Sequence, residues 1–310
     1  MSPSSVHAMT SITLLTPDPL ERTYAAAWPG LLQLIRDALA LEGITVVPTP
    51  WTAHVDDAAG LRDAKLVLPL LAWGYHAEHD RWLRACRTWM QAGVRLANPV
   101  EVLQWNSDKH YLARFAREGI GVPPTTWTDA VTQAQVEAVF EATGAAHVIV
   151  KPTVSGGAWK TLRLRPGEAL FDAPTGAAML QPYLSTIESA GETSLLFFGG
   201  RLSHVVNKRP VAGEFRVQSQ FGGDYTVLDA PPPDALELAQ RVLAAIDAPL
   251  LYARVDMVPD EAGRWLLMEL ELIEPDLYMA VDPAKGAGFA AAVRARLDAG
   301  NGVPSSATRR

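Results

Sequence analysis

The chain has 310 residues, 48% of them hydrophobic and 20% charged, which is typical of a globular enzyme with two or three packed units. Its formal net charge of −7 argues against a nucleic-acid-binding protein, which normally presents a basic face. Cys86 is the only cysteine, so an intramolecular disulfide is excluded, and no apolar run approaches membrane-spanning length. We therefore expect a cytoplasmic protein whose partner is a small molecule, with neither nucleic acid nor a membrane as partner.

Strand-like and helix-like segments alternate over residues 11–98. Short apolar runs predict strands at 12–16, 44–47, 65–71 and 94–96. Amphipathic periodicity predicts helices at 29–39, with Pro29 at the start and Gly43 after the end, and at 81–91. This alternation predicts a parallel α/β layer as the N-terminal domain.

Two further domains are predicted, a central lobe at 99–184 and a C-terminal lobe at 185–298. The central lobe has expected helices at 108–119, capped by Ser107 or Asp108, and at 132–143. Its strands or extended segments are expected at 147–152, 160–165 and 177–184. The C-terminal lobe has expected strands at 193–198, 201–208, 214–220 and 251–258, a further strand after 263, and helices at 233–246 and 288–297.

The acidic residues of the last two strands are the most informative feature. Asp256 lies in one strand-like run, and Glu269 and Glu271 lie two apart in the next, so the latter two share a strand face. The link 259–263 has the composition of a hairpin loop, and the hairpin would bring the three carboxylates together. Cations would have to neutralise them, and all-oxygen ligation suits Mg²⁺ completed by nucleotide phosphates. The alternative is a half-buried strand whose acids lie in water.

Lys151 ends an apolar strand and precedes a glycine-bearing loop. Ser155, Gly156 and Gly157 can offer backbone N–H groups to a phosphate without side-chain hindrance. The alternative is a plain hairpin loop with a lysine at the sheet rim. The sequence contains neither a Walker pattern nor a Gly-x-Gly-x-x-Gly fingerprint, so it supports neither a P-loop nor a dinucleotide-binding fold.

Several short motifs follow one another in the order found in ATP-grasp ligases. They are NSDK at 106–109, VIVKP at 148–152, SGG at 155–157, LQPY at 180–183, GETS at 191–194, RVD at 254–256 and ELE at 269–271. The chain thereby resembles the branch near glutathione synthetase and the ribosomal-protein glutamate ligases. SHVVNKRP at 203–210, GEFR at 213–216 and the glycine pair at 222–223 are similar to the subgroup that contains the cycloserine-forming cyclo-ligase.

The resemblance implies an α/β and α+β architecture, the ATP-grasp fold preceded by an N-terminal parallel α/β domain. It also implies the cofactors ATP and Mg²⁺, the latter as two ions held by Asp256, Glu269 and Glu271. Most relatives carry Asn at the last position, so Glu271 is a departure that retains an oxygen ligand. The implied nucleotide-binding residues are Lys109, Lys151, Ser155, Gly156, Gly157, Gln181, Pro182, Tyr183, Leu184 and Glu192.

Lys208, Arg216 and Arg254 are the cations expected to face the transferring phosphoryl group. Each is predicted to lie in a strand-like segment, and Arg254 shares a strand face with Asp256. The alternative for these cations is cross-strand salt bridging, which contributes little at a surface.

The acceptor substrate is expected at the end of strand 65–71, where Trp73 and His76 follow the carboxyl edge of the α/β layer. Related sequences often have an Arg just before this Trp, whereas Leu70 and Leu71 stand here, which favours a small amino-acid-like substrate over a polyanionic peptide. Core packing of Trp73 and a solvated His76 remain the alternative.

The expected reaction is ATP-dependent carboxylate–amine ligation through an acyl phosphate, with cyclisation within one molecule as one form of it. Alternatives are a peptide or dipeptide ligase, a kinase that releases a stable phosphorylated product, and a non-catalytic nucleotide-binding protein on the same scaffold. A homo-oligomer is compatible with each.

Overall fold

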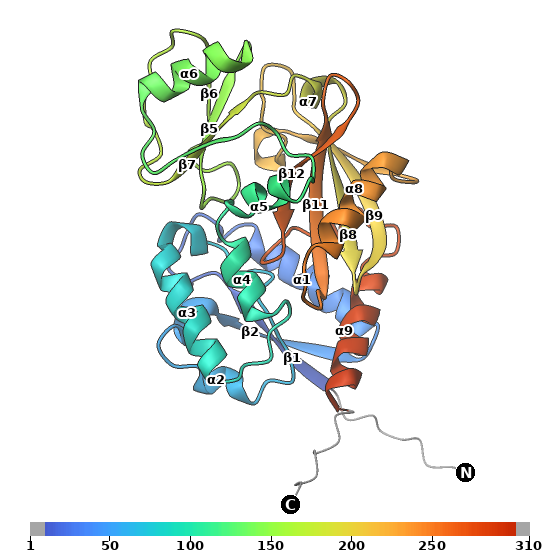
Figure 1. Ribbon diagram of the computed structural model, residues 1–310. Coiled ribbons are helices and arrows are strands. Elements are labelled where there is room, and N and C mark those ends of the chain that lie inside the picture. The colour runs from blue at the N-terminus through green and yellow to red at the C-terminus, as the bar shows by residue number, and fades with distance from the viewer. Residues whose placement is uncertain (1–9, 302–310) are drawn as a thin grey trace, which may run out of the picture.

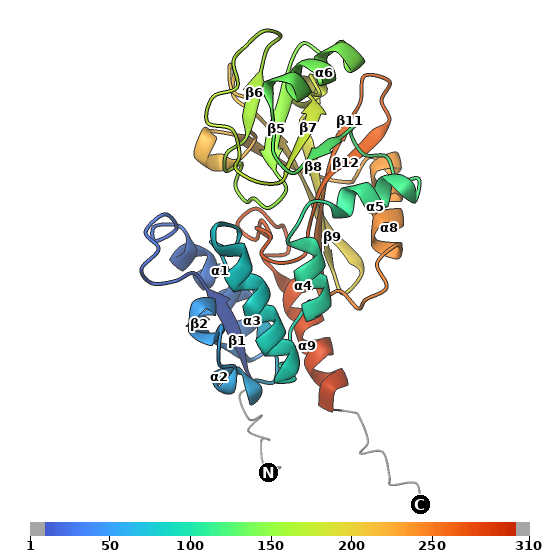
Figure 2. The same cartoon turned by 60° about the vertical axis from the view of Figure 1, so that its left-hand side comes forward.

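The computed structural model describes residues 10–301, which form three sheets arranged around one central region (Figures 1 and 2). The first sheet is parallel, in the order β2-β1-β3, with β1 Thr10–Thr16, β2 Ile44–Pro50 and β3 Val67–Leu68. Its helices are α1 Trp28–Ala40, α2 Ala59–Arg62 and α3 His79–Gln91, followed by α4 Val100–Asn106. The predicted N-terminal parallel α/β layer is therefore present.

The third strand of this sheet is shorter than predicted. Residues 65–71 supply only the two residues of β3, and the predicted strand at 94–96 is reduced to a single bridge between Leu96 and Val67. Pro69 follows β3 directly and has no backbone N–H to continue the ladder, so the chain turns there. This early end places Trp73 and His76 beyond the sheet edge, above the rest of the layer.

The second sheet is antiparallel and has the order β4-β7-β5-β6. Its strands are β4 Thr126–Thr128, β5 Val148–Pro152, β6 Leu162–Leu164 and β7 Ala178–Pro182. Helix α6 (Gln133–Thr143) begins at a capping box between Thr132 and Gln135 and ends at Gly144, whose φ of 63° is left-handed. The sequence predicted this helix within one residue.

The predicted helix at 108–119 is wrong in its first turn. The helix α5 spans Tyr111–Arg117 with His110 as N-cap, so neither Ser107 nor Asp108 caps it. Asp108 instead accepts a hydrogen bond from the backbone N–H of His110, and Ser107 donates to the carbonyl oxygen of Gln104 at the end of α4. This break between α4 and α5 is the segment that carries Lys109.

The third sheet is antiparallel and has the order β10-β9-β8-β11-β12. Its strands are β8 Glu192–Phe198, β9 Arg201–Arg209, β10 Asp224–Leu228, β11 Tyr252–Pro259 and β12 Trp265–Glu271. The helices are α7 Thr186–Ser189, α8 Pro233–Ala244 and α9 Ala287–Asn301. β11 and β12 form the predicted hairpin.

The predicted strand at 214–220 is wrong. This segment is a loop that ends in the 3₁₀ turn Ser219–Phe221, and β10 is the strand that pairs with β9. Gly223 explains the loop, because a Cβ on it would lie 1.9 Å from the carbonyl oxygen of Val217. The chain folds back on itself at that contact, which only glycine permits.

The C-terminal helix α9 packs against the N-terminal layer rather than against its own lobe alone. Phe289, Val293 and Leu297 share one buried cluster with Leu32 and Leu39 of α1. Figures 1 and 2 both show α9 running beside that layer. A Cβ on Gly286, just before α9, would lie 2.6 Å from the Cβ of Ala38, which measures how closely the two ends of the chain approach.

No helix within residues 10–301 has both the length and the apolar composition needed to cross a bilayer.

Candidate active site

One cavity of about 1050 Å³ lies where the three sheets meet. Every residue that the sequence analysis proposed as a site residue lines it. These are Trp73, His76, Lys109, Lys151, Ser155, Gly156, Gly157, Gln181, Pro182, Tyr183, Leu184, Glu192, Lys208, Arg216, Arg254, Asp256, Glu269 and Glu271. The structure thus brings together segments far apart in the sequence, while the role of each residue stays a prediction.

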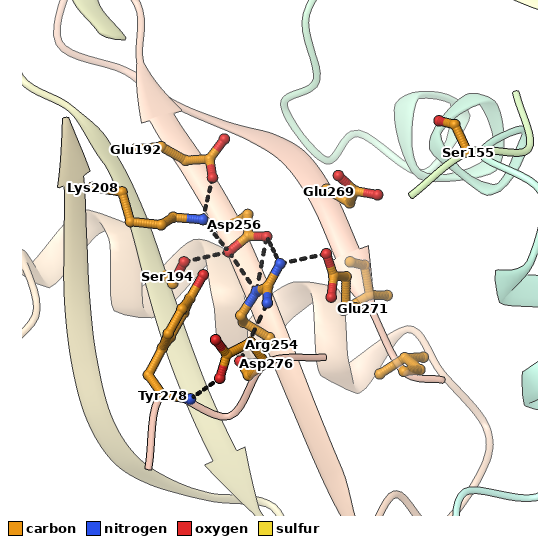
Figure 3. A network of polar contacts seen from close by, with 12 residues as sticks. Ser155, Glu192, Ser194, Lys208, Arg254, Asp256, Glu269, Glu271, Asp276 and Tyr278 are labelled. Atoms are coloured by element: carbon orange, nitrogen blue, oxygen red, sulfur yellow. Dashed lines mark hydrogen bonds and ion pairs between the residues drawn. The ribbon is translucent and has the colours of Figure 1, made fainter. Parts of the chain in front are cut away.

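The register of the third sheet aligns the acidic residues across its strands. Asp256 on β11 lies between Ser194 on β8 and Glu269 on β12, and the Ser194 hydroxyl donates a hydrogen bond to Asp256 Oδ1. Arg254, two residues earlier, lies opposite Glu271. Because alternate residues of a strand share a face, these side chains project together into the cavity, as Figure 3 shows.

Arg254 and Lys208 neutralise the carboxylates of this row (Figure 3). Arg254 Nη2 lies 3.0 Å from Asp256 Oδ2 and also pairs with Glu271, and Lys208 Nζ lies 3.5 Å from Asp256 Oδ1 and pairs with Glu192. The side chains of Asp256, Lys208 and Arg254 are 2%, 4% and 8% exposed. Burial alone would raise the pKa of Asp256, but the two cations outweigh it and hold that pKa below its usual value.

Glu271 differs from Asp256 in its electrostatics. Burial is the largest influence and raises the pKa of Glu271 to about 8, with Glu269 and Asp256 adding to the rise and Arg254 opposing it. A carboxyl group at this position therefore holds its proton more readily than Asp256 and Glu269, whose pKa values are lowered. Glu271 thus adds a titratable group to the site.

Lys109 connects the third sheet to the glycine-bearing loop. Its Nζ lies 3.1 Å from Glu269 Oε1 and donates hydrogen bonds to the carbonyl oxygen of Ser155 at 2.7 Å and to Ser155 Oγ at 3.2 Å. The loop is thereby held over the acidic hairpin at its first residue. Its outer part contacts the N-terminal layer, where the rings of Trp159 and His76 lie 5.8 Å apart.

The side-chain ammonium of Lys151 makes no hydrogen bond or ion pair with another residue within 10–301. It lies on β5 and lines the cavity, and burial lowers its pKa. Burial opposes the charge of this ammonium more than the nearby Glu269 and Glu192 support it, so the position favours an additional anion from a ligand. This is the environment expected of a phosphate-binding lysine.

The end of β7 and the loop after β9 complete the walls. Gln181 donates to Thr125 Oγ1, and the N–H of Tyr183 donates to the carbonyl oxygen of His147, so that N–H is not available to an adenine ring. Arg216 lies in a loop, not in a strand as predicted. It pairs with Glu214 at 2.7 Å and lies 3.6 Å above the ring of Phe221.

Trp73 and His76 form the wall of the cavity next to the N-terminal layer. Trp73 packs edge-to-face on Tyr24, with ring centroids 5.4 Å apart. His76 Nδ1 is buried and has no hydrogen-bond partner among the described residues. Burial lowers the pKa of His76 to about 4, and Lys109 adds to the effect, so the ring is neutral at pH 7.

Several known proteins are similar to this chain. Residues 12–98 match the family described as D-cycloserine synthetase DcsG, N-terminal domain. The chain is 27% identical to the cycloserine biosynthesis protein DcsG of Streptomyces lavendulae, over 86% of this chain and 99% of that protein. It is also 27% identical to the glutathione synthetase of Prochlorococcus marinus (strain MIT 9313), over 88% of this chain and 87% of that protein.

Solved structures agree with these relatives. The crystal structure of D-cycloserine synthetase DcsG matches with a TM-score of 0.77 and 26% identity, covering 93% of this chain and 99% of that one. The D-alanine–D-alanine ligase of Bacillus anthracis matches with a TM-score of 0.67 over 94% of this chain and 99% of that one, and at 14% identity it shows the fold alone. The chain is an ATP-grasp ligase. The predicted ATP-grasp fold is confirmed, as is the predicted class of enzyme, a ligase that forms carbon–nitrogen bonds.

The sequence analysis missed several residues that line the cavity of this ligase. Glu274, Asp276 and Tyr278 follow β12, and Tyr24 precedes α1. Tyr278 lies beneath both cations, with Arg254 Cζ 5.3 Å and Lys208 Nζ 5.8 Å from its ring. The available signal is the Glu-Pro-Asp run at 274–276, which continues the acidic pattern past Glu271 without alternating.

The pH dependence of stability provides a test of the His76 environment. In the unfolded chain this ring takes up a proton as the pH falls through about 6.5, whereas in the folded ligase it stays neutral until about pH 4. The unfolded state then binds more protons, so stability falls with the pH in this window. We expect His76→Gln to reduce the loss of unfolding free energy between pH 7 and 5, measured by urea denaturation of the ligand-free protein. An unchanged loss would show that the ring titrates normally.

Proposed function

We propose that this ligase joins a carboxylate to an amine at the expense of ATP, through an acyl phosphate, on a small amino-acid-like substrate. The observation that supports the proposal is that one cavity contains two kinds of group. Lys151 and the glycine-bearing loop line it, and so does the row formed by Arg254, Lys208 and their carboxylate partners. A nucleotide placed between them would bring its terminal phosphate to the cations. The wall of Trp73 and His76 would face the acceptor.

Lys109, Lys151 and the loop residues 155–157 would hold the phosphates. The ammonium of Lys151 pairs with no other described residue. Gly156 and Gly157 have no side chains, so an anion can approach their backbone N–H groups without hindrance. The end of β7, residues 181–184, would contact the adenine, and Glu192 the ribose. Structures of other ATP-grasp ligases have been solved with ATP or with Mg and ADP, which supports the same cofactors here.

The acidic hairpin fits a divalent ion in its donor chemistry. Asp256 and Glu269 lie opposite each other on neighbouring strands, and carboxylate oxygens suit Mg²⁺. Within residues 10–301 no three His, Cys, Asp or Glu side chains are close enough together to hold a metal ion as they stand, since Arg254 and Lys109 pair with these acids. When bound, Mg²⁺ would neutralise phosphate charge during transfer. Glu271 is proposed as a third ligand, and a second ion as part of the same site.

Arg254 and Lys208 would exchange partners when the nucleotide binds. In the ligand-free protein they neutralise Asp256, and both are close enough to the cavity to turn towards a phosphoryl group. This exchange would leave the carboxylates free for the metal while the cations stabilise the charge that develops on the transferred group. Arg216 is proposed to assist from the loop.

The proposed reaction has two steps. A substrate carboxylate oxygen attacks the γ-phosphorus, and the bond from phosphorus to the leaving oxygen of ADP breaks. An amine nitrogen then attacks the acyl carbon, the bond from that carbon to the phosphate oxygen breaks, and the nitrogen gives up a proton. Positioning and charge stabilisation are the contributions of the protein. The likeness to the cycloserine protein over 99% of its length favours an amine and a carboxyl carbon within one molecule.

An assay of ADP and phosphate release with a panel of amino acids, followed by mass determination of the product, tests this function. We expect a product that has lost water relative to its precursors, with one ADP and one phosphate per turnover. ADP with a stable phosphorylated product would indicate a kinase. Nucleotide binding without turnover on any member of the panel would indicate a non-catalytic protein.

Lys151→Ala is expected to weaken binding of a non-hydrolysable ATP analogue at least tenfold, about 1.4 kcal/mol. The reason is that burial opposes the charge of this ammonium, which lines the cavity and is proposed to pair with phosphate. Calorimetry at fixed Mg²⁺ measures the affinity, and Lys65→Ala, on the surface of the N-terminal layer, is the matched control. Equal affinity of Lys151→Ala and the wild type would remove this lysine from the nucleotide site.

A further inference from the structure

Tyr278 lines the cavity and has no role in the metal and nucleotide contacts proposed above. Its side chain is buried, yet its hydroxyl forms no hydrogen bond with any residue among 10–301. The oxygen is not enclosed by protein either, since the described side-chain atoms that are buried without a partner belong to His76, Trp82 and Gln218. A buried tyrosine usually has a hydrogen-bond partner for its hydroxyl. The hydroxyl of Tyr278 is therefore open to the cavity and available to a ligand.

The ring of Tyr278 lies against two cations. Arg254 Cζ is 5.3 Å and Lys208 Nζ is 5.8 Å from the ring centroid, and the face of an aromatic ring attracts a cation within about 6 Å. Figure 3 shows the ring reaching from the segment after β12 towards the row that contains Asp256. Because the hydroxyl is bonded to this ring, it lies in the same part of the cavity as the two cations.

The backbone around Tyr278 fixes the direction of the ring. Its φ of 49° is left-handed, a conformation that residues other than glycine seldom adopt. The carboxylate of Asp276 accepts the N–H of Tyr278 at 2.8 Å, and the carbonyl oxygen of Tyr278 accepts the N–H groups of residues 281 and 282 at 3.1 and 3.0 Å. His204 Nε2 donates to the carbonyl oxygen of Leu277 at 3.0 Å. Such conformations persist where the surroundings hold them, and they occur most often at functional sites.

We propose that the Tyr278 hydroxyl donates a hydrogen bond to the phosphoryl group while that group passes from ATP to the substrate carboxylate. The inference rests on the proposed function, which directs Arg254 and Lys208 to the same group. When these cations turn from Asp256 to the phosphoryl oxygens, the ring stays beside them and the hydroxyl adds a neutral donor. Burial raises the pKa of Tyr278, so the phenol keeps its proton and no bond to it forms or breaks. A donor fixed before the reaction needs little reorganisation as charge develops.

Tyr278→Phe isolates the hydroxyl, because it keeps the ring and removes one oxygen. The probe is ADP with Mg²⁺ and aluminium fluoride, which mimics a phosphoryl group in transfer, and calorimetry measures its binding. We expect the variant to bind this complex roughly 10- to 100-fold more weakly than the wild type does, and to bind ADP with Mg²⁺ alone equally well. Equal affinity of the two proteins for the fluoride complex would overturn the proposal, as would the same loss of affinity for ADP alone.

Tyr225→Phe is the matched comparison. Its ring packs edge-to-face on Tyr278, with centroids 5.4 Å apart, but its hydroxyl already accepts the N–H of Ser219 at 3.0 Å. We expect this variant to lose less affinity for the fluoride complex than Tyr278→Phe does. A larger loss in Tyr225→Phe would assign the donor to that ring and contradict the proposal.

Kinetics distinguish a hydroxyl that contacts the phosphoryl group from one that only supports the fold. We expect Tyr278→Phe to lower kcat roughly 10- to 100-fold while its KM for ATP and its melting temperature stay near the wild-type values. Rapid-quench single turnovers should place the loss in the formation of ADP. A lower melting temperature with an unchanged kcat would show a structural role and contradict the proposal.

The two kinds of measurement separate this inference from the proposed function. Binding of the fluoride complex that depends on the Tyr278 hydroxyl, without any amide product from the wild type, would contradict the proposed function and leave the inference intact. Amide formation by Tyr278→Phe at the wild-type rate would contradict the inference and leave the ligase reaction intact.

Discussion

Glu269→Gln and Asp256→Asn are each expected to lower kcat roughly 1000-fold or more at saturating Mg²⁺, because each removes a charged oxygen ligand from the proposed metal site. The two variants should differ in stability. Glu269 pairs with Lys109 at 3.1 Å and is partly exposed, so its variant should melt near the wild type. Asp256 is buried between Arg254 and Lys208, and its loss should cost about 3–5 kcal/mol of unfolding free energy in the ligand-free protein.

Steady-state kinetics over a series of Mg²⁺ concentrations, together with thermal melts, would measure both effects. Glu141→Gln is a useful control, since Glu141 is exposed on α6 and is not proposed to hold metal. Near-wild-type kcat in Glu269→Gln would show that the metal assignment is wrong, whatever the behaviour of the less stable Asp256 variant.

Arg254→Lys is expected to lower kcat by roughly 100- to 1000-fold while changing the KM for ATP far less. The guanidinium contacts Asp256, Glu271 and the carbonyl oxygen of Asp276 at once, a geometry that an ammonium cannot reproduce. Loss of one preorganised donor to a developing negative charge has an effect of this size. Rate measurements at saturating substrates would show it.

Arg→Lys substitutions at two other positions provide kcat values with which the effect at Arg254 can be compared. Arg216→Lys should have a smaller effect, because Arg216 lies in a loop and is held by Glu214 and Phe221. Arg201→Lys, exposed at the start of β9, should have none. A ranking in which Arg216 exceeds Arg254 would assign the stabilising role to the loop instead of to β11.

The sequence predicted those parts of the fold that depend on local regularities. The acidic hairpin followed from two-residue alternation and a glycine-bearing turn, and α6 followed from a capping box and a terminal glycine. Residues 214–220 alternate in the same way but form a loop, because the contact of Gly223 with Val217 is not visible in a periodicity. A local pattern therefore predicts an element only where no tertiary contact overrides it.

In the candidate site, too, local patterns were predictable from the sequence, whereas contacts between distant segments were not. The motif order predicted residues for the nucleotide and the metal, and the structure places all of them at one cavity. Glu274 and Asp276 escaped because they follow β12 in a segment without alternation, and only the assembled fold places them at the cavity. Similarly, no sequence feature indicated that Lys109 would join Glu269 to Ser155, since three segments must meet to form that contact.

The packing of α9 against α1 bears on how such ligases diversify. The segment matched by the N-terminal family ends at residue 98, yet part of its hydrophobic core is completed by Phe289, Val293 and Leu297 from the other end of the chain. An N-terminal layer exchanged between relatives to alter acceptor choice would therefore lose its partner surface unless α9 were exchanged with it. Recombination that takes both ends together keeps that interface, whereas a single crossover near residue 98 divides it. The hydrophobic core that such an exchange would have to preserve is therefore discontinuous in sequence.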